Sequence, residues 1–303
     1  MVEQVTRSIA PAVDARAAHM ARASRRRRRA LQAVRNVVLY AVIAAGSALF
    51  VLPFFWMLST SLKVPEQVWQ QPPVWIPRPI VFQNYVEAVN SVPTLTYLKN
   101  SVIVASLSIV GLVFSSSLVA FAFSRISWPG RNAWFAILLA TMMLPSQVTM
   151  IPVFVLFYRL GWVNTLKPLI VPSFFGSAFY IFLLRQFALG IPRELDESAV
   201  IDGANPLVIW FRIMLPLSGP ALAAVAIFSF VGCWNDFMGP LIYLNRTDQW
   251  TLPLGLLAFR TKYTTAWAQL MAYSTLVMLP CLLVFFFFQR YFIQGITLTG
   301  IKG

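Results

Sequence analysis

The chain of 303 residues contains one histidine and two cysteines, and only 11% of its residues are charged. The single histidine, His19, lies near the start of the chain, so the sequence does not provide the histidines that a metal centre or a proton relay would need. Cys233 and Cys281 both lie in or beside apolar runs. This placement favours small hydrophobic residues within helices over a disulfide or a metal site.

Two catalytic motifs are also missing from the sequence. It contains no phosphate-binding loop of the form G-x-x-x-x-G-K-[S/T], and one histidine excludes the zinc motif H-E-x-x-H. A membrane-embedded enzyme would need a catalytic group at the membrane face. The acids between residues 194 and 202 are the only candidates, and they have no histidine, cysteine or metal-ligand partner. The sequence therefore favours a protein that is not an enzyme and uses no cofactor.

Apolar residues are abundant instead. They make up 58% of the chain, and the mean hydropathy is +0.71, whereas a soluble domain is about 45–50% apolar. The apolar runs are continuous and longer than the alternating segments of about ten residues that form outer-membrane barrels. The sequence predicts an all-α, polytopic membrane protein.

Apolar runs long enough to cross a bilayer occur six times, at about 20 residues for each crossing. The predicted spans are 37–58, 98–123, 134–157, 169–187, 217–237 and 272–292. No span has a charge in its interior, and Asp236 lies at the outer edge of the fifth. Because proton- and ion-driven carriers place ionisable groups inside the membrane, this pattern weakens a secondary-transporter hypothesis.

The distribution of basic residues predicts the orientation. With residues at the span ends included, 16 of the 24 Lys and Arg residues fall on the side of the N-terminus and 8 on the other side. The positive-inside rule therefore places both termini and the loops 124–133 and 188–216 in the cytoplasm. The loops 59–97, 158–168 and 238–271 are expected outside. A bacterial inner membrane is the expected location.

Residues 1–36 form an Arg-rich tail that includes the run from Arg25 to Arg29. The tail is expected to lack structure or to form a loose amphipathic helix at the membrane surface. Basic residues before an apolar span indicate contact with the bilayer rather than with nucleic acid. The apolar run that follows, 37–62, is too long for a signal peptide and is expected to remain as an anchor. The predicted division of the chain is 1–36, 37–97, 98–290 and 291–303.

One polar stretch, 192–216, separates two apolar spans and contains four of the ten acidic residues. Pro192 suits the first position of a helix, and acids in a first turn are favoured by the helix dipole. Gly203 predicts the end of this helix. Asn205 followed by Pro206 predicts the start of a second short helix, which should end before Pro216. The stretch is expected to form a cytoplasmic helix–turn–helix.

Two features of the spans have alternative interpretations. Gln147 lies between Pro145 and Pro152, and this spacing predicts either a broken helix that lines a pathway or a kinked helix whose glutamine bonds to a neighbour. Three serines, 115–117, favour tight helix packing over contact with a solute. The loop 63–97, with six prolines, is expected to be a non-helical excursion along the membrane surface.

The stretch 197–216 also resembles a known family motif. Glu197-Ser198-Ala199 is followed after three residues by Gly203, and after nine more by Ile213-Met214-Leu215-Pro216. This spacing is similar to the EAA loop of ABC importer permeases, with serine in place of the first alanine. The ending Gln289-Arg290-Tyr291-Phe292 and the run Trp234-Asn235-Asp236-Phe237 resemble the carbohydrate importers of the maltose type (MalG-like).

The resemblance implies a sugar permease that works by alternating access. Its implied partners are a cytosolic ATPase dimer, a second and non-identical permease, and an extracytoplasmic solute-binding protein. Another solute, such as glycerol phosphate, a polyol or a peptide, is an alternative for the same architecture. The implied ATPase-docking residues are Glu197, Ser198, Ala199, Asp202, Gly203 and Ala204, with Glu197 facing a basic residue, and Lys302 reaching between the two ATPases.

A solute pathway is expected near Gln147, Trp234, Asn235 and Asp236, because amides and carboxylates beside an aromatic ring suit a neutral sugar. The alternative is that Asn235 and Asp236 only cap the fifth helix or support its neighbour.

Overall fold

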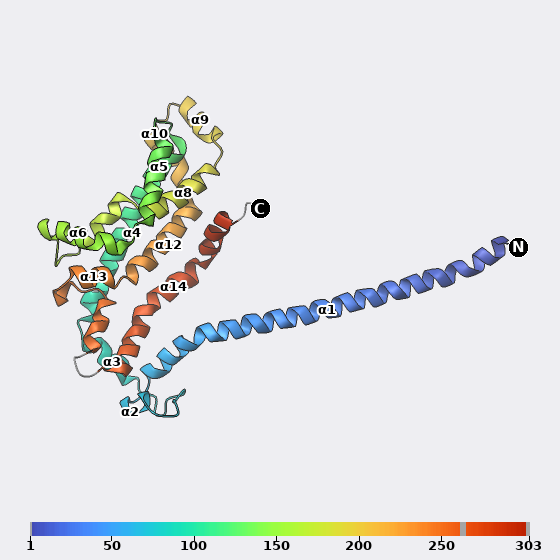
Figure 1. Ribbon diagram of the computed structural model, residues 1–303, viewed down its shortest axis with the longest axis horizontal. Helices are drawn as coiled ribbons and strands as arrows, with labels where there is room; N and C mark the ends of the chain where they lie inside the picture. The colour runs from blue at the N-terminus through green and yellow to red at the C-terminus, as the bar shows by residue number, and fades with distance from the viewer. Residues whose placement is uncertain (1, 261–264, 301–303) are drawn as a thin grey trace. The chain divides into compact units, whose positions relative to one another are not determined.

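The computed structural model describes the backbone of residues 2–260 and 265–300, and the side chains from Gln32 to Gln289 within those ranges. The described residues form helices and no strand; two residues, Arg260 and Thr265, make an isolated β-bridge. The chain divides into two compact units, Met1–Ser59 and Thr60–Gly303. Figure 1 labels most of the α-helices of both units.

The first unit consists of one helix. Helix α1 runs without a break from Val2 to Ser61, and its part from Gln32 to Ser61 is apolar enough to cross a membrane. Of the two alternatives for the Arg-rich tail, the helical one therefore describes the backbone of residues 2–36. The apolar side chains between Val37 and Leu58 are mostly exposed, as expected of a surface that faces lipid.

The second unit contains the other helices. Its α-helices are α2 (Pro65–Val68), α3 (Gln83–Asn90), α4 (Thr94–Arg125), α5 (Arg131–Ala140), α6 (Ser146–Arg159), α7 (Lys167–Ile170), α8 (Ala178–Leu189), α9 (Glu194–Ile201), α10 (Pro206–Ile209), α11 (Leu215–Leu217), α12 (Gly219–Trp234), α13 (Met238–Tyr243) and α14 (Trp267–Gly300). Five short 3₁₀- or π-helical segments join them: η1 (Thr141–Met143), η2 (Val171–Phe175), the π-helix η3 (Trp210–Met214), η4 (Thr247–Gln249) and η5 (Leu254–Phe259).

Helix α4 is the centre of this unit, and it packs against α8, α12, α7 and η2. Small residues make this possible, because glycine, alanine and serine allow helix backbones to approach closely. The small residues buried on α4 are Ser101, Ala105, Ser108, Gly111, Ser115, Ser116, Ser117, Ala120 and Ser124. The packing role expected for the serines 115–117 is confirmed, since all three are buried and Ser115 and Ser116 bond to the segment 173–177.

Four helical segments can each cross a membrane by length and composition, and two bent pairs raise the number to six. The four are Gln32–Ser61, Thr94–Arg125, Lys167–Leu189 and Trp267–Gln289. The bent pairs are Arg131–Met143 with Ser146–Arg159, at 97°, and Pro206–Leu217 with Gly219–Trp234, at 80°. Polytopic membrane architecture is confirmed, but the fourth predicted span is not one continuous helix, because it is interrupted at Gly176.

The bend in the third predicted span lies where the prolines predicted a break. Helix α5 and η1 end at Met143, and α6 starts at Ser146, directly after Pro145. Pro145 has no N–H to donate to a continuing helix. Pro152 lies inside α6 and does not end it.

One prediction about a loop is wrong in part. The excursion 63–97 contains helices α2 and α3 and is not wholly non-helical. Asn84 of α3 donates from its side chain to the carbonyl groups of Ser61 and Lys63, which holds this excursion against the end of α1. The loop 238–271 contains a polar turn at η4 and an apolar stretch at η5.

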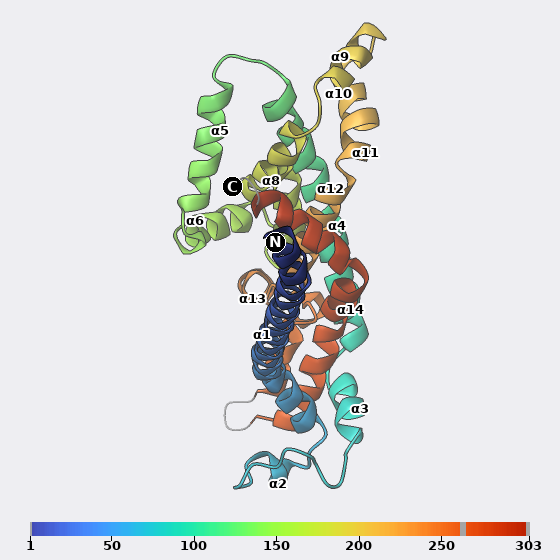
Figure 2. The ribbon, with the colours of Figure 1, turned by 90° about the vertical axis from the view of Figure 1, so that its right-hand side faces the viewer.

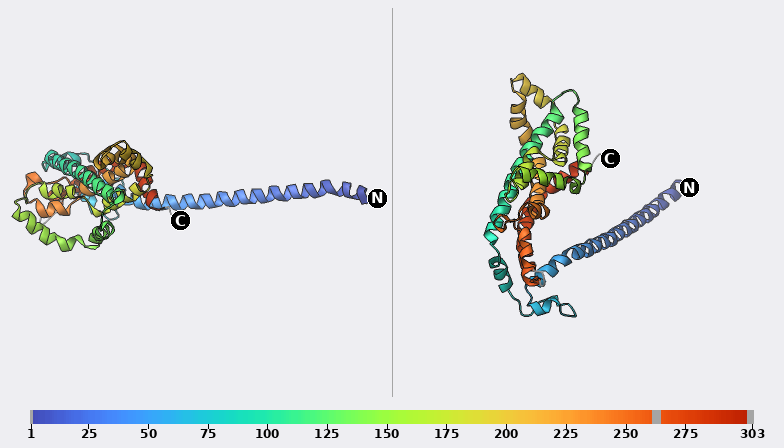
Figure 3. Two further views of the ribbon diagram at one scale, coloured as in Figure 1. Left: turned by 90° about the horizontal axis from the view of Figure 1, so that it is seen from above. Right: turned by 60° about the vertical axis from the view of Figure 1, so that its left-hand side comes forward.

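Two groups of short helices lie at opposite ends of the second unit. Helices α9 and α10 lie at one end and α2 and α3 at the other, in Figure 1, in Figure 2 and in the right-hand view of Figure 3. The turn from α4 into α5 lies at the α9 end (Figure 2), where Arg125 donates to the carbonyl of Ile191. Two of the loops predicted to lie outside bond to each other through Asn164 and Tyr243, and Asn100 at the start of α4 donates to the carbonyl of Asp248.

Candidate functional site

The polar stretch 192–216 folds into two short helices with a tight turn between them. Helix α9 begins at Glu194, two residues after Pro192, so the predicted proline start is wrong by two positions. The helix ends as predicted, because Gly203 has a φ of +83°, a conformation that costs other residues free energy. The amide of Ala204 then donates to the carbonyl of Ala199 at 2.9 Å, which closes the turn.

The second helix starts at the predicted cap. The side chain of Asn205 accepts a hydrogen bond of 2.9 Å from the amide of Val208, and Pro206 occupies the first helical position. Helix α10 continues through the π-helical segment η3 into α11 and ends at Leu217. Pro216 is accommodated within this last turn, so the prediction that the helix ends before it is wrong.

The helix pair is attached to the end of the bundle by a small apolar core. Ile209, Trp210 and Met214 are buried against Phe121 of α4 and Ala188 of α8. The ring of Trp210 also meets Phe114 edge to face, with 5.6 Å between the ring centroids. Burial of side chains of this size stabilises by about 1.5–3 kcal/mol each. The second helix is therefore held firmly.

The first helix is attached differently, through one ion pair. Nε of Arg125, the last residue of α4, lies 3.2 Å from Oδ2 of Asp196 on α9, and the two side chains are only 6% and 17% exposed. Nη2 of Arg125 donates to the carbonyl of Ile191 at 2.8 Å. Within the described part of the chain, neither Nε of Arg125 nor Oδ1 of Asp196 makes a hydrogen bond. Charge, rather than an aligned hydrogen bond, thus holds α9 to α4.

The outer surface of the helix pair has exposed apolar side chains next to acidic residues. Ile201 at the turn is 86% exposed, and Val200, Leu207 and Phe211 are also exposed. Glu197 and Asp202 lie on the same helix and turn, and both are exposed. Exposed apolar groups surrounded by charge are typical of a surface that another protein covers.

The six residues predicted to dock the ATPase lie on this pair and differ in their exposure. Glu197, Ser198, Asp202 and Gly203 are exposed, whereas Ala199 and Ala204 pack partly against the core around Trp210. The hydroxyl of Ser198 donates to the carbonyl of Leu195 within α9. The small alanines allow α9 to lie close to its own bundle, and the docking role of all six residues stays a prediction. Lys302 lies outside the described residues.

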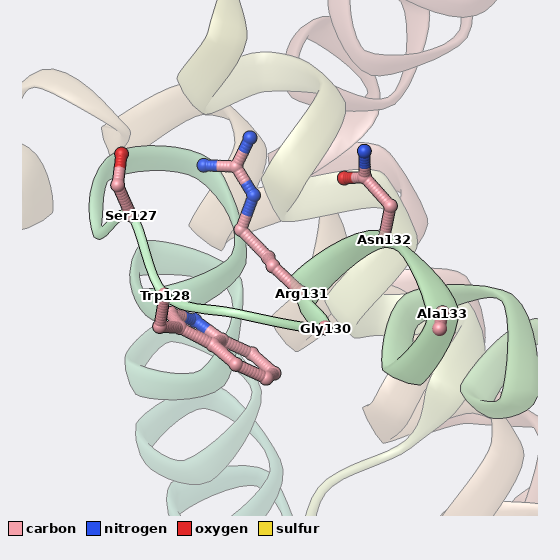
Figure 4. A pocket seen from close by; sticks show the side chains of 6 residues that line it. All are labelled: Ser127, Trp128, Gly130, Arg131, Asn132 and Ala133. Carbon is pink, nitrogen blue, oxygen red and sulfur yellow. The ribbon is translucent and has the colours of Figure 1, made fainter.

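A shallow pocket of about 250 Å³ lies in the turn from α4 into α5. Figure 4 shows its lining, in which the ring of Trp128 lies below the turn and Arg131 extends away from it. Ser127, Gly130, Asn132 and Ala133 complete the lining. All six residues come from one short segment, so the pocket belongs to the turn and receives no group from α9.

Gln147 lies on the exposed break of the third predicted span. Its side chain meets only its neighbour in sequence, with 3.5 Å between Oε1 and Oγ of Ser146, among the described residues. The structure brings it near no hydrogen-bonding group of the fifth span in that part of the chain. Contact of Gln147 with a solute stays a prediction.

The three other predicted pathway residues act in the structure as caps and supports. Trp234 is buried and donates from Nε1 to the carbonyl of Val277, which joins α12 to α14. Asn235 donates to the carbonyl of Val231 at the end of α12, and Asp236 accepts from the amide of Gly239 at the start of α13. The capping alternative thus describes the geometry of Asn235 and Asp236, and their contact with a solute remains untested.

The prediction that no span has a charge in its interior is wrong for the fourth span. Arg185 lies inside the fourth predicted span, where its Nε donates to the carbonyl of Phe123 at 3.3 Å. Its guanidinium group lies over the ring of Phe135, 4.2 Å from the centroid. Because Phe123 is in the last turn of α4, this arginine satisfies a carbonyl that the helix leaves free. The signal was present, since an arginine two residues from the end of a span needs a partner.

Comparison with known proteins decides the family. Residues 111–298 match the model of the family described as "Binding-protein-dependent transport system inner membrane component". The chain belongs to this family. Its members are membrane permease components, and the match includes the helix pair, the fourth and fifth predicted spans and most of α14.

Curated members of the family are similar over most of the chain. An arabinooligosaccharides transport system permease protein, AraQ of Halalkalibacterium halodurans, is 40% identical over 208 residues, covering 69% of this chain and 74% of that protein. A trehalose/maltose transport system permease protein, MalG of Thermococcus litoralis, is 33% identical over 277 residues, covering 88% and 96%.

A solved structure has the same fold. It is a bacterial ABC transporter involved in the import of the acidic polysaccharide alginate, with a TM-score of 0.75 and 23% identity. The match covers 86% of this chain and 96% of that one. The fold of the second unit is therefore that of an ABC importer permease.

Proposed function

We propose that this chain is the permease subunit of an ATP-driven importer that takes up an oligosaccharide. The pair α9–α10 docks on a cytosolic ATPase, and closure of the ATPases moves the pair and turns the cavity outward. A second permease and a solute-binding protein outside the membrane complete the assembly. The family description names binding-protein dependence, which supports the last of these partners.

One observation carries the docking proposal: the contrast between the inner and outer faces of the helix pair. The inner face is anchored by buried Trp210 and Met214, while the outer face exposes Ile201 beside the acids Glu197 and Asp202. A firmly anchored apolar tip with acids around it suits a basic-rimmed apolar cleft on a partner. The basic side chains of the ATPase would meet Glu197.

The oligosaccharide class rests on the relatives. The two curated permeases carry the names of arabino-oligosaccharides and of trehalose and maltose, and the structural relative carries that of alginate. These solutes are all built of linked sugars. The proposed membrane orientation, with the α9 end in the cytoplasm, is supported by the distribution of basic residues.

Co-purification tests the docking. The chain is expressed with the ATPase and the second permease from its own gene neighbourhood, and bound ATPase is measured per permease. Glu197→Lys is expected to lower the bound ATPase by about tenfold or more, because it places two positive charges together in a desolvated contact. The matched control is Glu66→Lys, the same charge change on exposed α2 at the opposite end, which should leave binding unchanged.

Equal binding of the ATPase by the Glu197→Lys variant and the unchanged protein would contradict the docking proposal. Loss of binding in the Glu66→Lys control would show that charge alone, and not the helix pair, determines association.

Uptake into proteoliposomes tests the solute class. The complete complex is supplied with ATP and radiolabelled arabino-oligosaccharides, trehalose, maltose or an alginate oligosaccharide. ATP-dependent uptake of at least one of these is expected. Uptake of glycerol phosphate, a polyol or a peptide, together with no uptake of any of the sugars, would support the importer function but contradict the oligosaccharide class.

A further inference from the structure

The two helices of the docking pair are held to the bundle by different kinds of contact. Helix α10 and η3 are held by the buried apolar residues Ile209, Trp210 and Met214. Helix α9 buries no side chain completely, and Ala199 is its only residue in that apolar cluster. Its polar attachment among the described residues is Asp196 with Arg125. The position of α9 therefore depends strongly on this pair.

Arg125 is well placed to hold two parts of the chain at once. It ends α4, where a positive charge is favoured by the helix dipole. One nitrogen lies 3.2 Å from Oδ2 of Asp196, and another donates to the carbonyl of Ile191 in the segment between α8 and α9. An arginine can do this because its guanidinium group presents several donors in a fixed plane.

Helix α4 connects this end of the unit to the other. It packs against α8, α12 and the broken segment α7–η2, and at its far end Asn100 donates to the carbonyl groups of Asp248 and Trp250. A displacement applied to α4 at Arg125 thus reaches every element that packs along it.

We propose that the Arg125–Asp196 ion pair is the joint that fixes α9 to α4, so that a movement of α9 moves the spanning bundle. The inference rests on the proposed function for its consequence, which is coupling of ATP hydrolysis to uptake. Arg125 and Asp196 are positioning residues, since they act through α9 and touch neither ATP nor solute.

Hydrogen exchange of the full-length permease in nanodiscs tests the joint without any partner. Asp196→Asn keeps the shape of the side chain and removes its charge. The amides of 195–202 are expected to exchange about tenfold faster, while those of 207–214 keep their protection, because local opening follows the contacts of each segment. Unchanged exchange in 195–202 overturns the joint.

Uptake per ATP hydrolysed tests the consequence, with the complete complex and the radiolabelled sugar that the uptake assay identifies. Asp196→Asn is expected to bind the ATPase normally and to lower uptake per ATP by about tenfold, within the usual range of coupling between sites. Asp196→Glu, which keeps the charge, should restore most of the ratio. An equal fall in uptake and hydrolysis, with their ratio unchanged, overturns the transmission of movement.

Two further variants distinguish the pair from general damage to folding. Arg125→Gln combined with Asp196→Asn leaves no single buried charge, and its uptake per ATP should equal that of Asp196→Asn alone, because the two residues act as one unit. Losses that multiply would overturn this. Glu194→Gln removes an exposed charge from the same helix and should change neither measurement; if it does, the charge of α9 and not the ion pair is responsible.

The two tests also separate this inference from the docking proposal. Faster exchange in α9 of the Asp196→Asn variant, together with no ATPase binding by the unchanged protein, would support the joint and contradict the docking proposal. Normal binding with unchanged exchange would keep the docking and reject the joint.

Discussion

The third and fourth predicted spans are both interrupted, but the two breaks have different surroundings. The fourth is broken between η2 and α8 at Gly176, and this break lies against the serines of α4. The third is broken between η1 and α6, and the whole stretch 140–152 is exposed in the described chain. One break is satisfied by a neighbouring helix, whereas the side-chain hydrogen bonds described at the other are local.

The hydrogen bonds show the difference. The hydroxyl of Ser108 donates to the carbonyl of Leu169, and the hydroxyl of Ser116 accepts from the amide of Ser177. At the third-span break, Thr141 donates to Leu138 and Thr149 to Ser146, each three residues away. Ser108 and Ser115 are seven residues apart and lie on one face of α4, so both bond to the segment that runs along it, at Leu169 and Ser173.

This contrast indicates the role of each break. Backbone groups freed at membrane depth need protein or water around them, because lipid offers no hydrogen bond. The fourth-span break has protein around it within this chain and is structural. If it lies at membrane depth, the third-span break is predicted to face another subunit or a water-filled pathway, which makes Gln147 the better of the predicted solute contacts to test.

Accessibility gives the largest expected difference between the breaks. Cysteine is placed at Gln147 or at Ser116, with Cys233 and Cys281 replaced by alanine. In the assembled complex, a charged maleimide should react at position 147 at least about tenfold faster, because position 116 becomes accessible only through local opening. Reaction at 147 in the isolated chain but not in the complex would mean that a subunit covers the break, and the pathway prediction would then be wrong.

A change at the fourth-span break itself should destabilise the protein next most strongly. Gly176 has φ +81° and ψ 175°, a conformation that essentially only glycine adopts. Gly176→Ala is expected to cost about 1–3 kcal/mol. The measurement is the thermal midpoint of the detergent-solubilised protein by size-exclusion chromatography. Gly232→Ala, on α12 with no atom within 4 Å of the added methyl group, is the control and should not lower the midpoint.

Removal of single serine hydroxyls should have a smaller effect. Ser108→Ala and Ser116→Ala each remove one hydrogen bond between elements, for which about 0.6 kcal/mol is typical within membranes. Thr149→Ala at the exposed break should stay within about 0.5 kcal/mol. The same midpoints measure all three variants. An effect of Thr149→Ala as large as that of the serines would remove the distinction between the two breaks.

An exposed ion pair away from both breaks should have the smallest effect. Hydrogen bonds from Arg246 lower the pKa of Asp248 below its ordinary value. A lowered folded-state pKa stabilises above the unfolded pKa, near pH 4, and the contribution is lost as the pH falls through the folded value. The midpoints of Arg246→Ala and the unchanged protein should therefore differ only slightly at pH 7, since solvent screens exposed charges, and should converge as the pH falls below 4. A large difference at neutral pH would contradict this.

Local signals in the sequence were sufficient for the helix pair. Gly203 at the end of α9 and Asn205 before α10 act through their own backbone or through an amide three residues away. The errors at Pro192 and Pro216 concern the helix ends, where a proline tolerates more than one position within the first turn. Bilayer thickness similarly made most of the spans predictable from apolar length alone.

Contacts between distant residues were decided by the tertiary structure. Arg125 and Asp196 belong to segments whose composition says nothing of each other, and Arg185 could be assigned a partner only after Phe123 and Phe135 were placed beside it. The same holds for Trp234 and Asn235, whose side chains suit contact with a solute. In the structure, Trp234 joins α12 to α14 and Asn235 caps the end of α12. The sequence by itself determined the membrane class, the helix pair and its caps, because each depends on backbone preferences or on apolar length within one segment. Only packing decided which breaks are covered and what holds α9, because hydrogen bonds and ion pairs across a bundle depend on which helices become neighbours.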